Sequence, residues 1–162
     1  MLKMRPCLAM GDRAKEAADF YVGIFPNSKI KTVSHYSEVG KEIHQRPPGS
    51  VLVVEFELDG QPFLTLNGGP ESSFTDAISF QILCKSQAEI DRYWEKLTGG
   101  GGKPIACGWL VDKFGVSWQI TPENMDRMLA DSKSPAYERV FSAMMEMVKL
   151  DMAALERAYA GK

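Results

Sequence analysis

The feature that most constrains the fold of this chain is a strand pattern that occurs twice. In the C-terminal copy, residues 112–115 form a turn, because glycine at 115 tolerates the positive φ that a tight hairpin needs. Apolar and polar residues then alternate from 116 to 121, which is typical of a strand with one apolar face. An earlier turn at 58–61 leads into a similar strand at 63–67. The repetition predicts one structural unit used twice.

The segments around these hairpins extend the repetition. Glycine, proline and capping residues separate strand-like from helix-like stretches, with Asp12 and Ser86 placed to cap helices. Residues 37–50 are predicted to form a long loop. The order β-α-β-β-β therefore occurs in two tandem modules, at 4–67 and 76–121, which we expect to form one domain over residues 1–122. The predicted elements are 5–10, 14–25, 29–36, 51–58 and 61–67 in the first module, and 77–84, 86–98, 103–106, 107–111 and 116–121 in the second.

A helical extension at 123–162 follows the two modules. Its central helix carries Phe141, Met144, Met145 and Met147, which the repeated unit does not need for its own core. Two interpretations stay open: packing on the body of the same chain, or an interface that makes a homodimer.

Composition and charge exclude several classes of function. The formal net charge is −2 and no basic run occurs, which argues against a nucleic-acid partner. No apolar run is long enough for a membrane span, and the N-terminus is too short in its apolar part for a signal peptide. The three cysteines, Cys7, Cys84 and Cys107, are predicted to be reduced and largely buried, as in a cytoplasmic protein.

Several stretches resemble the PhnB-like branch of the vicinal oxygen chelate superfamily, which includes glyoxalase I, extradiol dioxygenases and antibiotic-resistance binding proteins. They are GDRAKEAADFYVGIFPNSKI, VEFELDGQPFLTLNGGP, ISFQILC, DRYWEKL and CGWLVDKFGVSWQITP. The resemblance implies an α+β fold of the glyoxalase/bleomycin resistance type, in which two βαβββ modules form a curved mixed sheet around a cleft. It also implies a homodimer.

Members of this branch are often labelled demethylubiquinone 3-methyltransferase, but the glycines argue against that activity. A Rossmann-like methyltransferase binds its nucleoside cofactor at a glycine-rich turn between a strand and a helix. Here residues 99–102 follow a helix and precede a strand, and residues 68–69 lead into a linker. We therefore do not expect methyltransferase activity.

The alternation assigns one face of each strand to a candidate ligand site. Apolar residues, including Leu64 and Leu66, are expected to pack under the helices. The opposite faces then carry small or uncharged polar groups, which suit a ligand cleft, although such residues can also simply face water. The candidate ligand-binding residues are Cys7, Thr65, Asn67, Ser79, Gln81, Ser117 and Gln119.

Two carboxylates, Glu55 and Glu57, are the candidate catalytic residues. They stand at i and i+2 on one strand, so they point the same way, and a raised pKa would make one of them a base. The alternative is a pair of solvated carboxylates. Cys7 could be a nucleophile, but a buried structural thiol is the alternative, since no histidine or basic cluster accompanies it.

The resemblance also implies where a metal would bind. Metal-dependent relatives place ligands at positions that align near 5–7, 65–67, Ser79 and Gln119, and only Gln119 is of a suitable type. We therefore expect no cofactor and no metal ligands, and predict a protein that binds a small organic molecule without the usual divalent ion. The alternatives are a metal-dependent isomerase, lyase or dioxygenase-type enzyme with a non-standard ligand set around Gln119, Glu55 or Glu57, and a dimeric interaction module.

Overall fold

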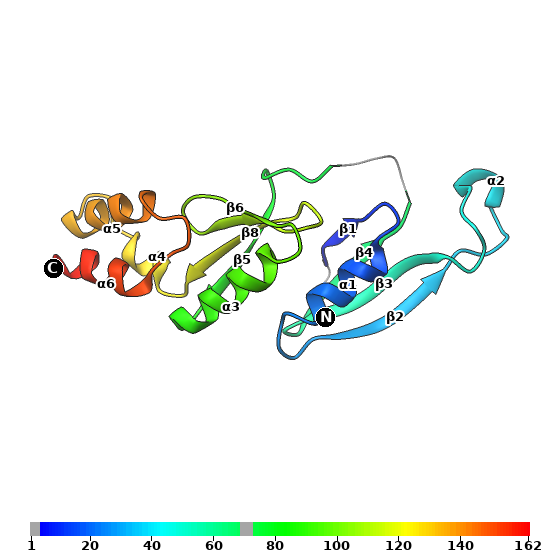
Figure 1. Ribbon diagram of the computed structural model, residues 1–162, viewed down its shortest axis with the longest axis horizontal. Helices are drawn as coiled ribbons and strands as arrows, with labels where there is room; N and C mark the ends of the chain where they lie inside the picture. The colour runs from blue at the N-terminus through cyan, green and yellow to red at the C-terminus, as the bar shows by residue number, and fades with distance from the viewer. Residues whose placement is uncertain (1–3, 69–72) are drawn as a thin grey trace. The chain divides into compact units, whose positions relative to one another are not determined.

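The structure, a computed structural model, describes residues 4–68 and 73–162 (Figure 1). The chain divides into two compact units, Met1–Ser73 and Phe74–Lys162. One predicted module lies in each unit, and the C-terminal helices belong to the second. A single domain formed by both modules around a common cleft stays a prediction.

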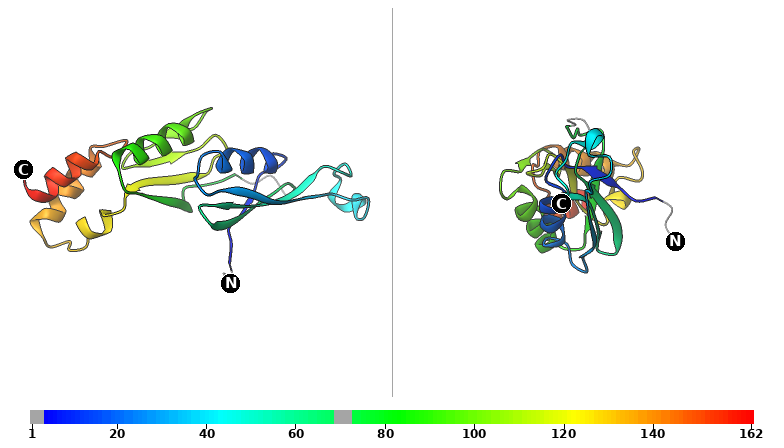
Figure 2. Two further views of the ribbon diagram at one scale, coloured as in Figure 1. Left: turned by 90° about the horizontal axis from the view of Figure 1, so that it is seen from below. Right: turned by 90° about the vertical axis from the view of Figure 1, so that its right-hand side faces the viewer.

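The first unit is a four-stranded sheet with one long helix on one face (Figure 2). The strand order is β1-β4-β3-β2, in which β1 pairs with β4 in parallel and the other pairs are antiparallel. The short helix α2 lies at the tip of the β2–β3 connection (Figure 1), inside the stretch predicted to be a loop. The elements are β1 (Cys7–Ala9), α1 (Ala14–Val22), β2 (Lys29–His35), α2 (Lys41–His44), β3 (Val51–Leu58) and β4 (Gln61–Leu66).

Small residues let α1 approach the first sheet closely. Ala14, Ala17 and Ala18 are fully buried, so no bulky side chain separates the helix from the strands. Tyr21 then fills the core and stacks on Phe56 of β3, with ring centroids 6.4 Å apart. The helix begins where expected, but not through Asp12: Arg13 is its N-cap residue and makes no side-chain capping bond.

The second unit repeats the same connectivity. Its strand order is β5-β8-β7-β6, in which β5 pairs with β8 in parallel and the others are antiparallel. The predicted α+β class, the two βαβββ modules and the two predicted hairpins are therefore confirmed. The elements are β5 (Ser79–Cys84), α3 (Gln87–Thr98), β6 (Lys103–Pro104), β7 (Trp109–Val111), β8 (Ser117–Pro122), α4 (Met125–Met128), α5 (Pro135–Met145) and α6 (Met152–Ala160).

The turn between β7 and β8 is organised by a buried carboxylate. Asp112 is 3% exposed, and its Oδ1 accepts hydrogen bonds from the backbone N–H of Phe114 (2.8 Å) and of Val116 (3.0 Å). Its Oδ2 accepts a third bond from the indole Nε1–H of Trp118, at 2.9 Å. Gly115 has φ 90°, as the sequence predicts. One side chain thus fixes the turn and the strand that follows it.

The C-terminal helices pack on themselves and on the start of β7. Met144 and Met147 are half-buried against a core formed by α4, α5 and α6, so these two residues pack on the body of the same chain, the first of the two interpretations. The backbone N–H groups of Cys107 and Gly108 donate to the carbonyl oxygens of Met147 and Val148, both at 2.8 Å. The extension is therefore bonded to the second sheet through the main chain.

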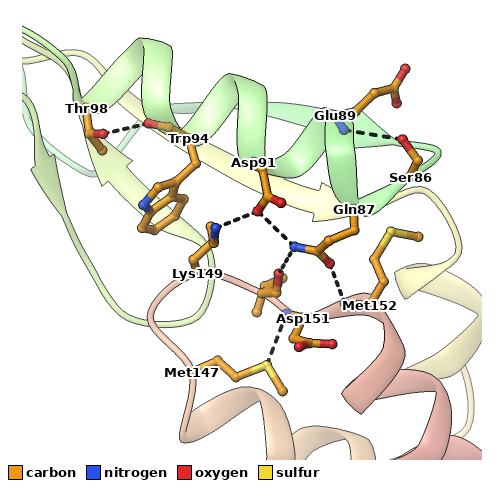
Figure 3. Close-up of polar contacts among 11 residues, drawn as sticks. Ser86, Gln87, Glu89, Asp91, Trp94, Thr98, Met147, Lys149, Asp151 and Met152 are labelled. Carbon is orange, nitrogen blue, oxygen red and sulfur yellow. Dashed lines mark hydrogen bonds and ion pairs between the residues drawn. The ribbon is translucent and has the colours of Figure 1, made fainter.

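A polar cluster fixes the extension to α3 as well (Figure 3). Gln87 donates from Nε2 to the Leu150 carbonyl at 3.1 Å, and its Oε1 accepts from the N–H of Met152 at 2.9 Å. Asp91 is paired with Lys149, whose hydrogen bond, together with one from Gln87, holds the pKa of that carboxyl below its usual value. The two ends of the Gln87 amide thus clamp the segment between α5 and α6.

Candidate functional site

The predicted site residues fall in three separate places. Four lie on the face of the second sheet opposite α3, three lie on the free face of the first sheet, and two lie beneath α1. The three groups differ in burial and in hydrogen bonding.

The second sheet brings together four predicted ligand-binding residues, Ser79, Gln81, Ser117 and Gln119. The parallel pairing of β5 with β8 places Ser79 beside Ser117 and Gln81 beside Gln119. Gln119 is half-buried and donates from Nε2 to the Ser79 hydroxyl at 2.8 Å. This bond orients the amide, and its carbonyl oxygen remains as an acceptor on an uncharged group. The arrangement suits positioning a neutral polar ligand rather than holding a cation.

An aromatic residue that the sequence analysis did not select lies next to this group. Trp109 of β7 is paired directly with Gln119 across the antiparallel ladder, so both side chains are on the same face. Trp109 is half-buried. The alternation of Trp109, Leu110 and Val111 could have revealed it, because Leu110 is fully buried on the α3 side. An indole beside an oriented amide can stack on a planar ligand.

The free face of the first sheet carries Cys7 and the two glutamates, as predicted. The register places Cys7, Leu64 and Glu55 in one row across β1, β4 and β3. Glu55 is paired with Arg5, so its charge is already compensated. Cys7 is exposed, and the prediction that it is largely buried is wrong.

Glu57 does not have the properties of a general base. Lys31 donates to its Oε1 at 3.1 Å, and Lys29 lies 3.6 Å from Oε2. The hydrogen bond from Lys31 holds the pKa of Glu57 below its usual value, whereas a base at neutral pH needs a raised one. A β-bulge between Ile30 and Thr32 inserts Lys31 as an extra residue.

Thr65 and Asn67 lie on the opposite face from the one predicted. Thr65 is fully buried and donates its hydroxyl to the Ala14 carbonyl at 2.8 Å. Asn67 accepts from the Ala14 N–H at 2.7 Å and donates to the Val51 carbonyl at 3.1 Å. These polar groups attach the start of α1 to the sheet. Leu64 and Leu66 take the free face instead.

The other two cysteines differ in their surroundings. Cys84 is buried, and desolvation raises its pKa to about 12, so its thiol stays protonated. Cys107 is half-buried, with Sγ 3.7 Å from Sδ of Met145. All three cysteines are free thiols, as predicted.

A cavity of about 310 Å³ is present in the first unit, at the end of the sheet where α1 begins. Asn67 is the one predicted site residue that lines it, and it does so while capping α1. The cavity lining consists of Asp12, Lys15, Arg46, Pro47, Ser50, Val51 and Asn67.

Neither a metal cluster nor a membrane-spanning helix is present in the part of the chain that the structure describes. Within 4–68 and 73–162, no group of three or more histidine, cysteine, aspartate or glutamate residues is placed to hold a metal ion. Nor is any helix in those ranges long and apolar enough to cross a membrane.

Comparison with known proteins gives a family and a fold. A family model described as 3-demethylubiquinone-9 3-methyltransferase matches residues 2–121. The structure of a PhnB protein from Bacillus cereus is 32% identical, with a TM-score of 0.66, over 75% of this chain and 99% of that chain. No curated protein matches.

More distant structures share the fold alone. Protein PA1353 from Pseudomonas aeruginosa is 16% identical, with a TM-score of 0.60, over 75% of this chain and 98% of that one. The fosfomycin resistance protein FosX from Listeria monocytogenes, complexed with Mn(II) and sulfate, is 17% identical with a TM-score of 0.51, over 80% of this chain and 98% of that one.

Proposed function

Because the chain belongs to the PhnB-like family described as 3-demethylubiquinone-9 3-methyltransferase, a branch of the vicinal oxygen chelate superfamily, we propose that it binds a small organic molecule on the Gln119 face of the second sheet. The observation that carries the proposal is the hydrogen bond from Gln119 to Ser79 beside Trp109. An oriented amide next to an indole suits a planar ligand with a polar substituent, such as a small aromatic carbonyl compound.

The proposed ligand does not need a divalent metal. FosX is complexed with Mn(II), but its likeness to this chain extends to the fold alone. Here the amide of Gln119 is bonded to a serine hydroxyl, and neither group is a strong ligand for a divalent ion. Metal analysis of protein purified without chelators tests this part of the proposal. A stoichiometric divalent ion would overturn it and favour the metal-dependent alternative.

Methyl transfer is not part of the proposal. Nucleotide-binding turns between a strand and a helix use several glycines, so that the backbone can approach the phosphates. In the first unit a single glycine, Gly11, lies between β1 and α1, and Ser86 leads into α3 in the second. Neither turn has the composition of a nucleoside-cofactor site.

We predict that Gln119→Ala leaves the fold intact and weakens ligand binding by about 0.5–3 kcal/mol, depending on whether a ligand group is left unpaired. The probes are small aromatic ketones, with acetophenone as the simplest, measured by ligand-observed NMR. Gln61→Ala is the matched control, because Gln61 is exposed at the start of β4. Equal binding by both variants would contradict the role of Gln119.

We also propose that the protein forms a homodimer through α5. Phe141 and Met145 are 42% and 56% exposed, one helical turn apart, and Tyr137 stacks on Phe141 with ring centroids 5.7 Å apart. Val148, three residues beyond the end of α5, is also exposed, at 52%. A second copy of the chain would cover an apolar surface that the helical core leaves free.

Phe141→Glu is expected to raise the dimer dissociation constant at least about tenfold, because a charge would be buried without a partner. Sedimentation velocity over a concentration series measures the change. Ser142→Glu is the control, since it adds the same charge at the next, polar position of the helix. A wild-type protein that stays monomeric at micromolar concentration would overturn the proposal.

A further inference from the structure

Two side chains of opposite charge line the cavity in the first unit without forming an ion pair. Arg46 and Asp12 both line it, and neither charged side chain has a side-chain partner among residues 4–68 and 73–162. They do not pair with each other either. Lys15, by contrast, forms an ion pair with Asp19, with 2.6 Å between Nζ and Oδ2. One positive and one negative group therefore remain available to a ligand.

Contacts within the first unit hold the segment around Arg46 in place without a ligand. Its backbone N–H donates to Nδ1 of His44 at 3.0 Å, and the His44 ring packs on Tyr36 with centroids 4.6 Å apart. The Tyr36 hydroxyl in turn donates to the Asn67 carbonyl at 2.7 Å. This chain of contacts ties the loop before β3 to the end of β4. A preorganised wall reduces the entropy lost when a ligand binds.

Asp12 lines the cavity from the segment between β1 and α1. Gly68 donates its N–H to the carbonyl of Gly11 at 2.8 Å, which holds the residue before Asp12 against the end of β4. The capping role that Asp12 could have filled belongs to Asn67, which accepts from the Ala14 N–H. The Asp12 carboxylate is thereby left unengaged beside the cavity.

We propose that this cavity binds a small zwitterion, with an acidic group on Arg46 and an amino group on Asp12. Guanidinium recognises carboxylates and phosphates through paired hydrogen bonds, and a carboxylate accepts from an ammonium group. The volume of about 310 Å³ is at the lower end of the range for ligand sites, which suits a molecule of amino-acid size. This site lies in the first unit and is independent of the function proposed for the Gln119 face.

The test compares compounds that carry both charges with compounds that carry one. The probes are β-alanine and phosphoethanolamine as zwitterions, propionate as the acid alone and propylamine as the amine alone. Two-dimensional NMR of the full chain follows the backbone amides of residues 12–15, of Arg46 and of residues 49–51. We expect saturable shifts with at least one zwitterion and binding at least tenfold weaker with the single-charge probes. The tighter of the two zwitterions identifies the acid as carboxylate or phosphate.

Two variants assign the charges, each with a matched control in the second unit. Arg46→Gln and Asp12→Asn are each expected to weaken zwitterion binding at least tenfold, whereas Arg157→Gln and Asp126→Asn are expected to leave it unchanged. No saturable shift with either zwitterion would overturn the proposal. So would propionate or propylamine binding as tightly as the tighter of the two zwitterions, and this comparison uses the wild-type chain, so it does not depend on how the variants fold.

Discussion

Replacing Asp112 with alanine is expected to lower the free energy of unfolding of the second unit by about 3–4 kcal/mol. The carboxylate accepts three hydrogen bonds, from two backbone N–H groups and from the Trp118 indole, in a site that is 3% exposed. Alanine would leave these donors without their acceptor, and each buried donor without a partner costs about 1–3 kcal/mol. Urea unfolding followed by tryptophan fluorescence measures the loss, because all three tryptophans lie in the second unit.

An asparagine at the same position separates the three bonds. In Asp112→Asn, Oδ1 can still accept from Phe114 and Val116, but the amide nitrogen cannot accept from the indole of Trp118. An intermediate loss is expected. Asp126→Ala, which removes an exposed carboxylate of α4, controls for the change in charge. If Asp112→Ala is no more destabilising than this control, the carboxylate does not organise the turn.

Replacing Gly108 with alanine is expected to cost about 2–5 kcal/mol and to loosen the C-terminal helices. Gly108 has φ +82°, and a Cβ atom there would lie 2.8 Å from the Ile120 carbonyl and 3.0 Å from Cδ1 of Leu150. The added methyl group therefore brings both backbone strain and a collision with the extension. Urea unfolding gives the loss of stability, and limited proteolysis reports release of residues 123–162.

A second glycine isolates the contribution of the collision. Gly60 has φ +81°, almost the same as Gly108, but a Cβ atom there would have no neighbour within 4 Å. Gly60→Ala is expected to lower the free energy of unfolding by about 1–2 kcal/mol, the cost of backbone strain at positive φ alone. Urea unfolding followed by circular dichroism measures the loss. Equal losses for the two alanine variants would show that the contact with Leu150 is not tight.

The fold was predictable from sequence because its signals are local. Turn glycines, capping residues and period-2 alternation mark the elements, and their order repeats. Ser86 caps α3, as expected, and Asp151 caps α6 in the same way. Asp12 failed as a cap because Asn67, more than fifty residues away in sequence, satisfies the first N–H of α1 instead. Sequence spacing carries no information about such a partner.

The faces of the strands were only partly predictable. Alternation says that a strand has two faces but not which one a helix covers, and polarity alone misplaced Thr65 and Asn67. Their hydrogen-bonding groups are buried because α1 uses them. The register of the β3–β4 hairpin would have corrected the assignment of Thr65. A two-residue turn after Leu58 pairs Glu55 with Leu64, so these two share a face. Thr65, the next residue, then points to the opposite face.

The parallel pairing of β1 with β4 has a consequence for rearranging the chain. Because these neighbours run in the same direction, the first module begins at one end of its sheet and finishes at the other. In the first module Cys7 lies beside Leu64 and Ala9 beside Leu66, so the two ends are separated by two residue steps, about 7 Å at about 3.3 Å per residue. In the second module β5 and β8 overlap from Ser79 beside Ser117 to Cys84 beside Pro122, five steps or about 17 Å. A circular permutant of the second module would therefore need a joining segment of at least about five extended residues, and a direct fusion of its ends should pull β5 out of its sheet.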